Sequence, residues 1–126
     1  SMKNPVLMQA MPTNQGWNFT VTLIDMATEL FYRFEGDDKF TSTGFMPYLD
    51  SRTGKKMPGN GINAPLDQGK TKIYFKYTGV NGEEHGPFEI LFDPIKARDE
   101  WCKQLQSQMG KDYRIQSYPG CENFSG

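Results

Sequence analysis

Histidine and cysteine are scarce in this sequence, and their scarcity limits the metal chemistry that the chain can support. Among 126 residues there is one histidine, His85, and there are two cysteines, Cys102 and Cys121, which do not form a Cys-x-x-Cys pair. A standard zinc site draws its four ligands largely from such residues. We therefore expect no metal centre, no cofactor and no His-based catalytic relay. We interpret His85 as a solvent-facing residue just past a turn, opposite Thr78.

Long apolar runs and an excess of charge are also absent. No stretch approaches the roughly 18 apolar residues of a membrane-spanning helix, and the N-terminal residues lack the apolar segment of a secretory signal. We interpret Ser1-Met2 as a remnant of an expression tag. The formal net charge of −1 argues against the phosphate-attracting field on which many nucleic-acid-binding proteins depend. We expect neither a membrane span nor a nucleic-acid partner.

Aromatic residues are well represented, at 13% of the chain. They supply bulky core material, and a chain of this length is typical of one domain. The sequence therefore predicts a single domain over residues 1–126 with one packed core.

The clearest pattern is a β-hairpin over residues 71–92. Asn81-Gly82 favours a two-residue type I′ turn, and this turn sets Phe75 opposite Phe88. Alternation then places six large side chains on one face, namely Ile73, Phe75, Tyr77, Phe88, Ile90 and Phe92. Each stabilises the fold by roughly 1.5–3 kcal/mol when fully buried, so the hairpin is predicted to form the centre of the core.

Alternation predicts further strands on both sides of this hairpin. A strand at residues 17–24 would point four side chains inward, which are Trp17, Phe19, Val21 and Leu23. A strand at residues 28–35 would place three side chains on one face, which are Leu30, Tyr32 and Phe34. Shorter strands are predicted around residues 6–10, 39–46, 62–66 and 112–118. The sequence leaves open whether the strands at 17–24 and 28–35 pair with each other or lie in opposite sheets.

The apolar period changes after the hairpin, where Asp93-Pro94 predicts an N-cap and the first helical position. Gly110 predicts the end of the helix, so the helix should span about 94–109. Helical spacing predicts an apolar face of Ile95, Cys102, Leu105 and Met109 with Trp101 beside it, and a wet face that includes Arg98. Cys102 is then either a buried free thiol or, if the tail folds back, half of a disulfide with Cys121.

Residues 47–70 form a long stretch with little helix or strand pattern. Such loops in small domains are often functional when they are ordered. A small basic cluster in this loop could meet an anionic partner, although such clusters are more often only solvated surface. Two tyrosines are the best-placed aromatics for a ligand, one at the mouth of the loop and one on the wetter face of the hairpin, opposite Glu89. The candidate binding residues are Tyr48, Arg52, Lys55, Lys56 and Tyr74.

Two runs, TELFYRFEGDDKFTSTGF and KIYFKYTGVNGEEHGPFEILFD, share a style of aromatic-rich strand. Over roughly residues 17–92 the chain thereby resembles the immunoglobulin-like β-sandwich modules appended to bacterial multidomain proteins. This resemblance implies a non-catalytic accessory or interaction role. The helix at 94–109 departs from a plain sandwich and keeps an α+β arrangement open.

The sequence therefore predicts a mainly β, immunoglobulin-like antiparallel β-sandwich with one C-terminal α-helix. We expect a non-enzymatic interaction module that binds a protein partner, or a neighbouring domain of the same chain, through a sheet edge or the 47–70 loop. The alternative is a carbohydrate-binding module that uses Tyr48, Tyr74 or Trp17 to stack on a glycan. A small enzyme ranks third, because the sequence offers no nucleophile–base pair and no ligand cluster.

Overall fold

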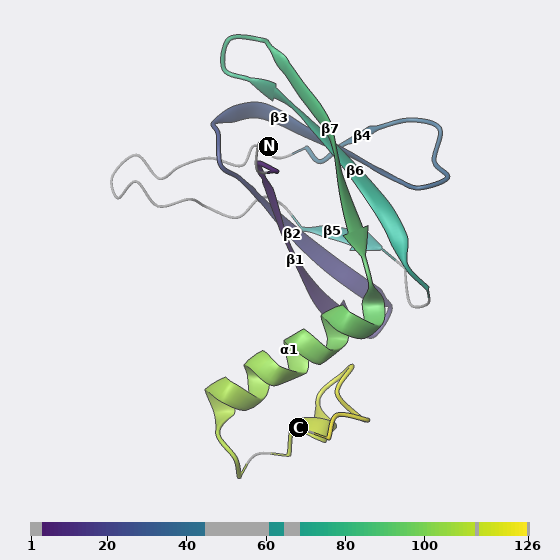
Figure 1. The fold of residues 1–126 in the computed structure, drawn as a ribbon, viewed down its shortest axis with the longest axis vertical. Helices are drawn as coiled ribbons and strands as arrows, with labels where there is room; N and C mark the ends of the chain where they lie inside the picture. Colours follow the sequence, from purple (N-terminus) through teal and green to yellow (C-terminus); the bar gives the residue numbers. More distant parts are fainter. Residues whose placement is uncertain (1–3, 45–60, 65–68, 113, 126) are drawn as a thin grey trace.

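The computed structural model of the chain describes residues 4–44, 61–64, 69–112 and 114–125. These residues form mainly β structure followed by a single C-terminal α-helix (Figure 1). The strands are β1 (Val6–Thr13), β2 (Gly16–Leu23), β3 (Ala27–Phe34), β4 (Thr41–Ser42), β5 (Ile62–Ala64), β6 (Thr71–Gly79) and β7 (Glu84–Phe92). The helix α1 spans Pro94–Met109, and a short 3-10 helix, η1, spans Ile115–Ser117.

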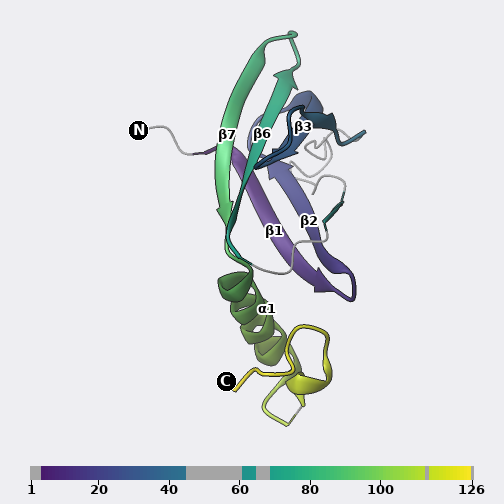
Figure 2. The same cartoon turned by 90° about the vertical axis from the view of Figure 1, so that its right-hand side faces the viewer.

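Two antiparallel sheets, ordered β1-β2-β5 and β4-β3-β6-β7, pack as a β-sandwich, and α1 extends from one end of it (Figure 2). The predicted mainly β sandwich with one C-terminal helix is confirmed, rather than an α+β arrangement. The question left open by the sequence is also settled, because β2 and β3 lie in opposite sheets.

The side chains that alternate inward meet between the sheets. In β2 all four predicted positions are buried, which are Trp17, Phe19, Val21 and Leu23. Phe92 joins the two sheets, since its ring lies edge-on to Trp17 at 5.0 Å and to Phe19 at 4.9 Å between centroids. Such perpendicular contacts are favourable for aromatic rings. The four-stranded sheet contributes Leu30, Ile73, Phe75 and Tyr77.

The hairpin of β6 and β7 keeps the predicted pairing in its outer half, where Phe75 faces Phe88 and Ile73 faces Ile90. The predicted type I′ turn is wrong. Among the described residues only glycines have a positive φ, whereas a type I′ turn needs two consecutive ones. Gly79 instead donates to the Glu83 carbonyl at 2.7 Å and closes a three-residue loop that ends in Gly82, with φ of 83°. This arrangement is typical of a turn followed by a G1 bulge.

A second irregularity restores the register further from the turn. Tyr77 faces His85, so that Lys76 lies opposite both Gly86 and Pro87. Gly86 has a φ of 111°, and a Cβ there would lie 2.8 Å from the Phe75 carbonyl oxygen. The extra residue in β7 offsets the odd loop length. The prediction that His85 faces Thr78 is therefore wrong, because Thr78 faces Glu84.

Two predicted strands are wrong or shortened. Only Thr41–Ser42 of the strand predicted at 39–46 pairs within the part of the chain that is described, and residues 45 and 46 lie outside it. In the region predicted as a strand at 112–118, the residues that the structure describes, 112 and 114–118, form no strand. They contain η1, which places Ile115 against the disulfide between Cys102 and Cys121, where it is 1% exposed.

The helix begins and ends as predicted, and the Asp93 carboxylate accepts hydrogen bonds from the Ile95 and Lys96 N–H groups. Its predicted faces are partly wrong. Ile95 is 81% exposed, because the helix packs on the main core through Ala97, two residues later. Arg98 is not on a wet face, since its guanidinium lies 5.3 Å over the Trp17 ring.

A small second core lies between α1 and the C-terminal tail. Cys102, Ile115 and Cys121 are buried together, with Trp101, Leu105, Met109, Tyr118 and Phe124 packed around them. The cysteines form a disulfide with 5.7 Å between their Cα atoms. The described residues thus form two apolar clusters instead of the single core that was predicted.

Candidate functional site

Four of the five predicted binding residues, Tyr48, Arg52, Lys55 and Lys56, lie outside the described residues. The fifth, Tyr74, faces Glu89 as predicted, on the outer face of the four-stranded sheet. Its ring is not open, because the Arg33 guanidinium carbon lies 4.4 Å from the ring centroid.

The aromatic rings around Tyr74 are covered in the same way. Lys76 places its Nζ 4.7 Å from the Phe40 centroid and 5.4 Å from the Phe31 centroid. Cation–π contacts of this kind hold the side chains together, but they occupy the ring faces on which a sugar would stack. Trp17, the other aromatic considered for a glycan, is 1% exposed and belongs to the core.

The hairpin tip holds a polar cluster around Tyr77. The Tyr77 hydroxyl donates to Asp25 at 2.9 Å, and its ring stacks on His85 with 4.8 Å between centroids. Burial and the bond to Asp25 raise the pKa of Tyr77 to about 12. The backbone N–H of Glu83 and the nearby His85 lower the pKa of the Glu83 carboxyl. These contacts brace the tip, and the described residues include no group of three metal-ligating side chains.

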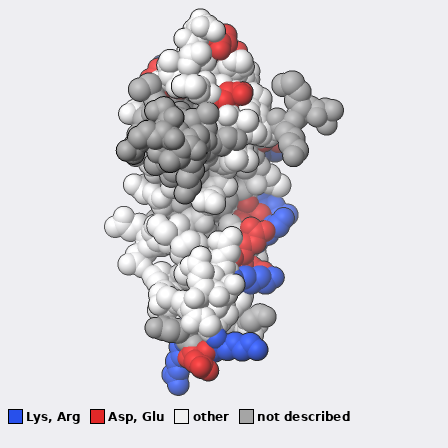
Figure 3. Space-filling view, turned by 90° about the vertical axis from the view of Figure 1, so that its left-hand side faces the viewer, with Lys and Arg blue, Asp and Glu red and all other residues white. Residues whose placement is uncertain are grey.

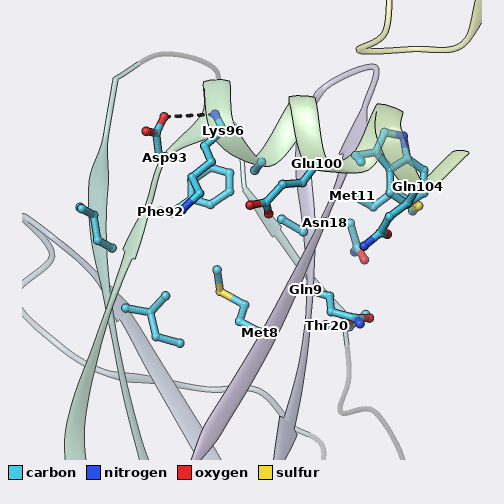
Figure 4. A pocket seen from close by; sticks show the side chains of 15 residues that line it. Met8, Gln9, Met11, Asn18, Thr20, Phe92, Asp93, Lys96, Glu100 and Gln104 are labelled. Carbon is cyan, nitrogen blue, oxygen red and sulfur yellow. Dashed lines mark hydrogen bonds between the residues drawn. The ribbon is translucent and has the colours of Figure 1, made fainter. Parts of the chain in front are cut away.

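A groove of about 430 Å³ lies between β1, the end of β7 and α1. Figure 4 shows Met8 pointing into the space between the two strands, with the helix across one end and Glu100 above the opening. Apolar side chains from three elements line it, among them Met8, Ala10, Ile90 and Ala97. Polar side chains from α1 form the rim, among them Lys96, Glu100 and Gln104.

One wall of this groove is a strand edge with which no other described strand pairs. β1 is the outer strand of its sheet, and the Pro5 carbonyl accepts a hydrogen bond from the Ile24 N–H at 3.0 Å. In an antiparallel pair, successive residues direct their N–H and C=O groups alternately toward and away from the partner. Pro5 is thus a residue that faces β2. By this alternation, every second residue after it also directs its N–H and C=O groups toward β2, namely Leu7, Gln9 and Met11. Val6, Met8 and Ala10 therefore point theirs away from β2, and Met8 and Ala10 face the groove.

The two ends of this edge are already closed. The Val6 N–H donates to the Asn4 side chain at 2.9 Å, and Asn4 in turn donates to the Glu89 carbonyl of β7 at 3.4 Å. At the other end Pro12 has no N–H to offer. The free donors of the edge are therefore the backbone N–H groups of Met8 and Ala10.

The β1 edge also lacks charge, a bulge and short length, which are features that usually protect an edge strand. Its one proline, Pro12, lies near the end of the strand. The edge strands β4 and β5 have two and three residues, and the edge strand β7 carries Pro87 and Glu89. β1 has eight residues and no charged side chain. It is the one long edge without charge among the described strands.

A sequence signal for this edge exists. Residues 4–24 and 61–64 contain no Lys, Arg, Asp or Glu, so no charge falls on β1, β2 or β5. Figure 3 shows a broad uncharged area below the grey segment, with the charged side chains gathered mainly along the margins. Alternation alone does not reveal the groove, because it depends on the long-range approach of α1.

Comparison of the chain with protein-family models, with curated proteins and with solved structures gives no match. No helix in the described part of the chain has the length and apolar character needed to cross a membrane. The functional argument therefore rests on the geometry of the groove and of the β1 edge.

Proposed function

We propose that this chain is a non-catalytic interaction module of a larger protein, and that it binds an extended protein segment along the edge of β1. One observation carries this proposal: the N–H and C=O groups of Met8 and Ala10 face a groove and not a neighbouring strand. Strand addition at a free sheet edge is a recurrent mode of peptide recognition. The proposal agrees with the accessory role implied by the resemblance to immunoglobulin-like modules.

The groove supplies both parts of such recognition. Two N–H and two C=O groups offer four backbone hydrogen bonds, each of which contributes about 0.5–1.5 kcal/mol net. Every second side chain of an added strand would point inward, against Met8 and Ile90, which are both partly buried on the main core. The main chain would thus provide affinity, and the apolar floor would select side chains of suitable size.

Carbohydrate binding has weaker support. A glycan-binding face needs exposed rings, whereas Tyr74 lies under Arg33, and the rings of Phe31 and Phe40 have Lys76 over them. An enzyme needs convergent polar groups in a pocket. The groove lining holds Gln9, Asn18 and Thr20 beside the polar side chains of the helix, but the described residues that line it include no His, Cys or Ser.

Ala10→Pro tests the edge while it keeps the β1–β2 ladder, because the Ala10 N–H points away from β2. Ala10→Val is the matched control, since it adds bulk at the same position and retains the N–H. Peptides selected from a random phage-displayed library should bind the wild type and Ala10→Val. Binding to Ala10→Pro should be about tenfold weaker or more, which corresponds to the loss of roughly 1.4 kcal/mol.

Amide exchange measured by NMR locates the bound peptide and checks the fold. In the free monomer Leu7, Gln9 and Met11 should exchange slowly, and Met8 and Ala10 should exchange fast. A bound peptide should slow Met8 and Ala10. The proposal is overturned if the selected peptides bind Ala10→Pro as well as the wild type, or if they protect amides elsewhere. It is also overturned if a glycan array gives a hit and the peptide library gives none.

A further inference from the structure

We infer that the segment taken up by the β1 edge is the β1 strand of a second copy of this chain, paired antiparallel about a two-fold axis at Gln9. This inference rests on the proposed edge function and names its partner. The argument comes from the free hydrogen-bonding groups, from the side chains on each face, and from the charge of the edge.

The hydrogen-bonding groups select one register. With Gln9 on the axis, Met8 faces the partner's Ala10, and Ala10 faces the partner's Met8. Both are positions whose N–H and C=O groups point away from β2, so each pair can exchange two hydrogen bonds. All four free donors of the two edges are then used.

Neighbouring registers use these groups less well. An axis at Met8 would pair Ala10 with the partner's Val6, whose N–H is already bonded to its own Asn4 side chain. An axis at Ala10 would set Met8 opposite the partner's Pro12, which has no N–H to give. Only the axis at Gln9 avoids both faults.

The side chains agree with the same axis. On the outer face Leu7, which is 50% exposed, would meet the partner's Met11, and Met11 itself is 43% exposed. The two Gln9 side chains would meet between these apolar pairs. On the groove side a large Met8 would lie beside the small Ala10 of the partner. The face is thus self-complementary, as a two-fold interface requires.

Charge favours a second copy as well. A two-fold axis brings each residue near its own symmetry mate, so a charged residue on the axis would repel itself. None of residues 4–24 carries a charge. Depletion of charge and enrichment of Met are also typical of the buried centre of protein interfaces.

Paired charge variants at the axis test this inference. Gln9 is exposed in the single chain, so Gln9→Lys and Gln9→Glu should both fold. Sedimentation velocity of the full chain at low salt should show the wild type at twice its 14.4 kDa mass as concentration rises. Either variant alone should associate about fivefold more weakly than the wild type, since like charges across an axis cost on the order of 1 kcal/mol.

Mixing the two variants gives the decisive measurement. Lys facing Glu across the axis should restore a dimer that contains one copy of each variant. Asn63→Lys is the matched control, because it adds the same charge to β5, the opposite edge of the same sheet, and should leave self-association unchanged.

Each negative result has a separate meaning. The inference is overturned if the wild type stays monomeric, if Gln9→Lys associates like the wild type, or if the mixture does not reassociate. When the wild type is monomeric but a selected peptide still binds in an Ala10→Pro-sensitive way, the second copy is refuted and the proposed function stands. When no peptide binds this edge either, both are refuted.

Discussion

Loss of the Cys102–Cys121 disulfide should release the C-terminal tail and leave the two sheets folded. The bond lies in the small cluster around Ile115, which is separate from the core between the sheets. The tail reaches the sandwich at Gly120, where an added Cβ would lie 3.0 Å from the Pro12 ring. The perturbation is therefore local, and either a reductant or the double substitution Cys102→Ala, Cys121→Ala produces it.

The size of the effect follows from the loop that the disulfide closes. The two cysteines are 19 residues apart, and closing a loop of this length removes about 3 kcal/mol of chain entropy from the open state. Burial of Ile115 contributes only roughly 1.5–3 kcal/mol. Ordering residues 111–125 costs about 1 kcal/mol or more per residue. Without the cross-link the tail lacks enough buried surface to stay docked.

Hydrogen exchange followed by mass spectrometry measures this effect. Protection of the amides around Ile115 should fall by roughly 100-fold, the factor that corresponds to about 3 kcal/mol. Amides in β6 and β7 should keep their protection. Addition of a reductant to the double-alanine protein should cause no further change. The reasoning is refuted if the tail keeps its protection after reduction, or if the sheets lose protection together with it.

Three substitutions test the fold around the groove and the hairpin. Because the pKa of Tyr77 is raised to about 12 from 10.0, the unfolded chain loses this proton first, so stability should fall as pH rises from 10 to 12. In Tyr77→Phe, the free energy of unfolding measured in urea should fall by roughly 2 kcal/mol less over this pH range than in the wild type. Gly86→Ala should cost about 1–3 kcal/mol, read from denaturant midpoints, since φ is positive and the Phe75 carbonyl blocks a Cβ. Asp93→Ala should cost about 1 kcal/mol in the same assay through loss of the N-cap.

Matched variants separate these causes from general damage. Equal loss of stability between pH 10 and 12 in the wild type and Tyr77→Phe would contradict the Tyr77 assignment. Gly82 also has a positive φ, but a Cβ there would meet no atom within 4 Å. Gly82→Ala should therefore lower the free energy of unfolding less than Gly86→Ala does. Asp93→Asn retains a capping oxygen, and a loss as large as that of Asp93→Ala would argue against the cap.

Local signals in the sequence predicted most of the framework. The period of two in β2 and β6 identified the buried side chains, because each strand has one face on the core. The pair Asp93-Pro94 and the glycine at 110 identified both ends of α1, since each acts through its own backbone.

The same local reasoning failed at the hairpin turn and in the tail. Asn81-Gly82 favours a type I′ turn, but Gly79 closes a longer loop, and the extra residue at Gly86 and Pro87 corrects the register afterwards. The odd loop length and the extra residue in β7 offset each other, so the outer pairs of the hairpin keep the register that a type I′ turn would give. In the tail, Ile115 packs with the disulfide-bonded Cys102 and Cys121, and no local period reports a cross-link to a distant residue.

The groove shows why the candidate site was harder to predict than the core. Alternation assigns the Leu7 and Met8 side chains to opposite faces wherever β1 lies in its sheet. The direction of a backbone N–H becomes important only when one side of the strand has no neighbour, and that is a property of the whole topology. Had another strand paired with β1 on its open side, Met8 and Ala10 would bond to that strand, and the same sequence would offer no edge. The absence of charge over residues 4–24 is compatible with either placement, so the outer position of β1 is the tertiary fact on which both proposals depend.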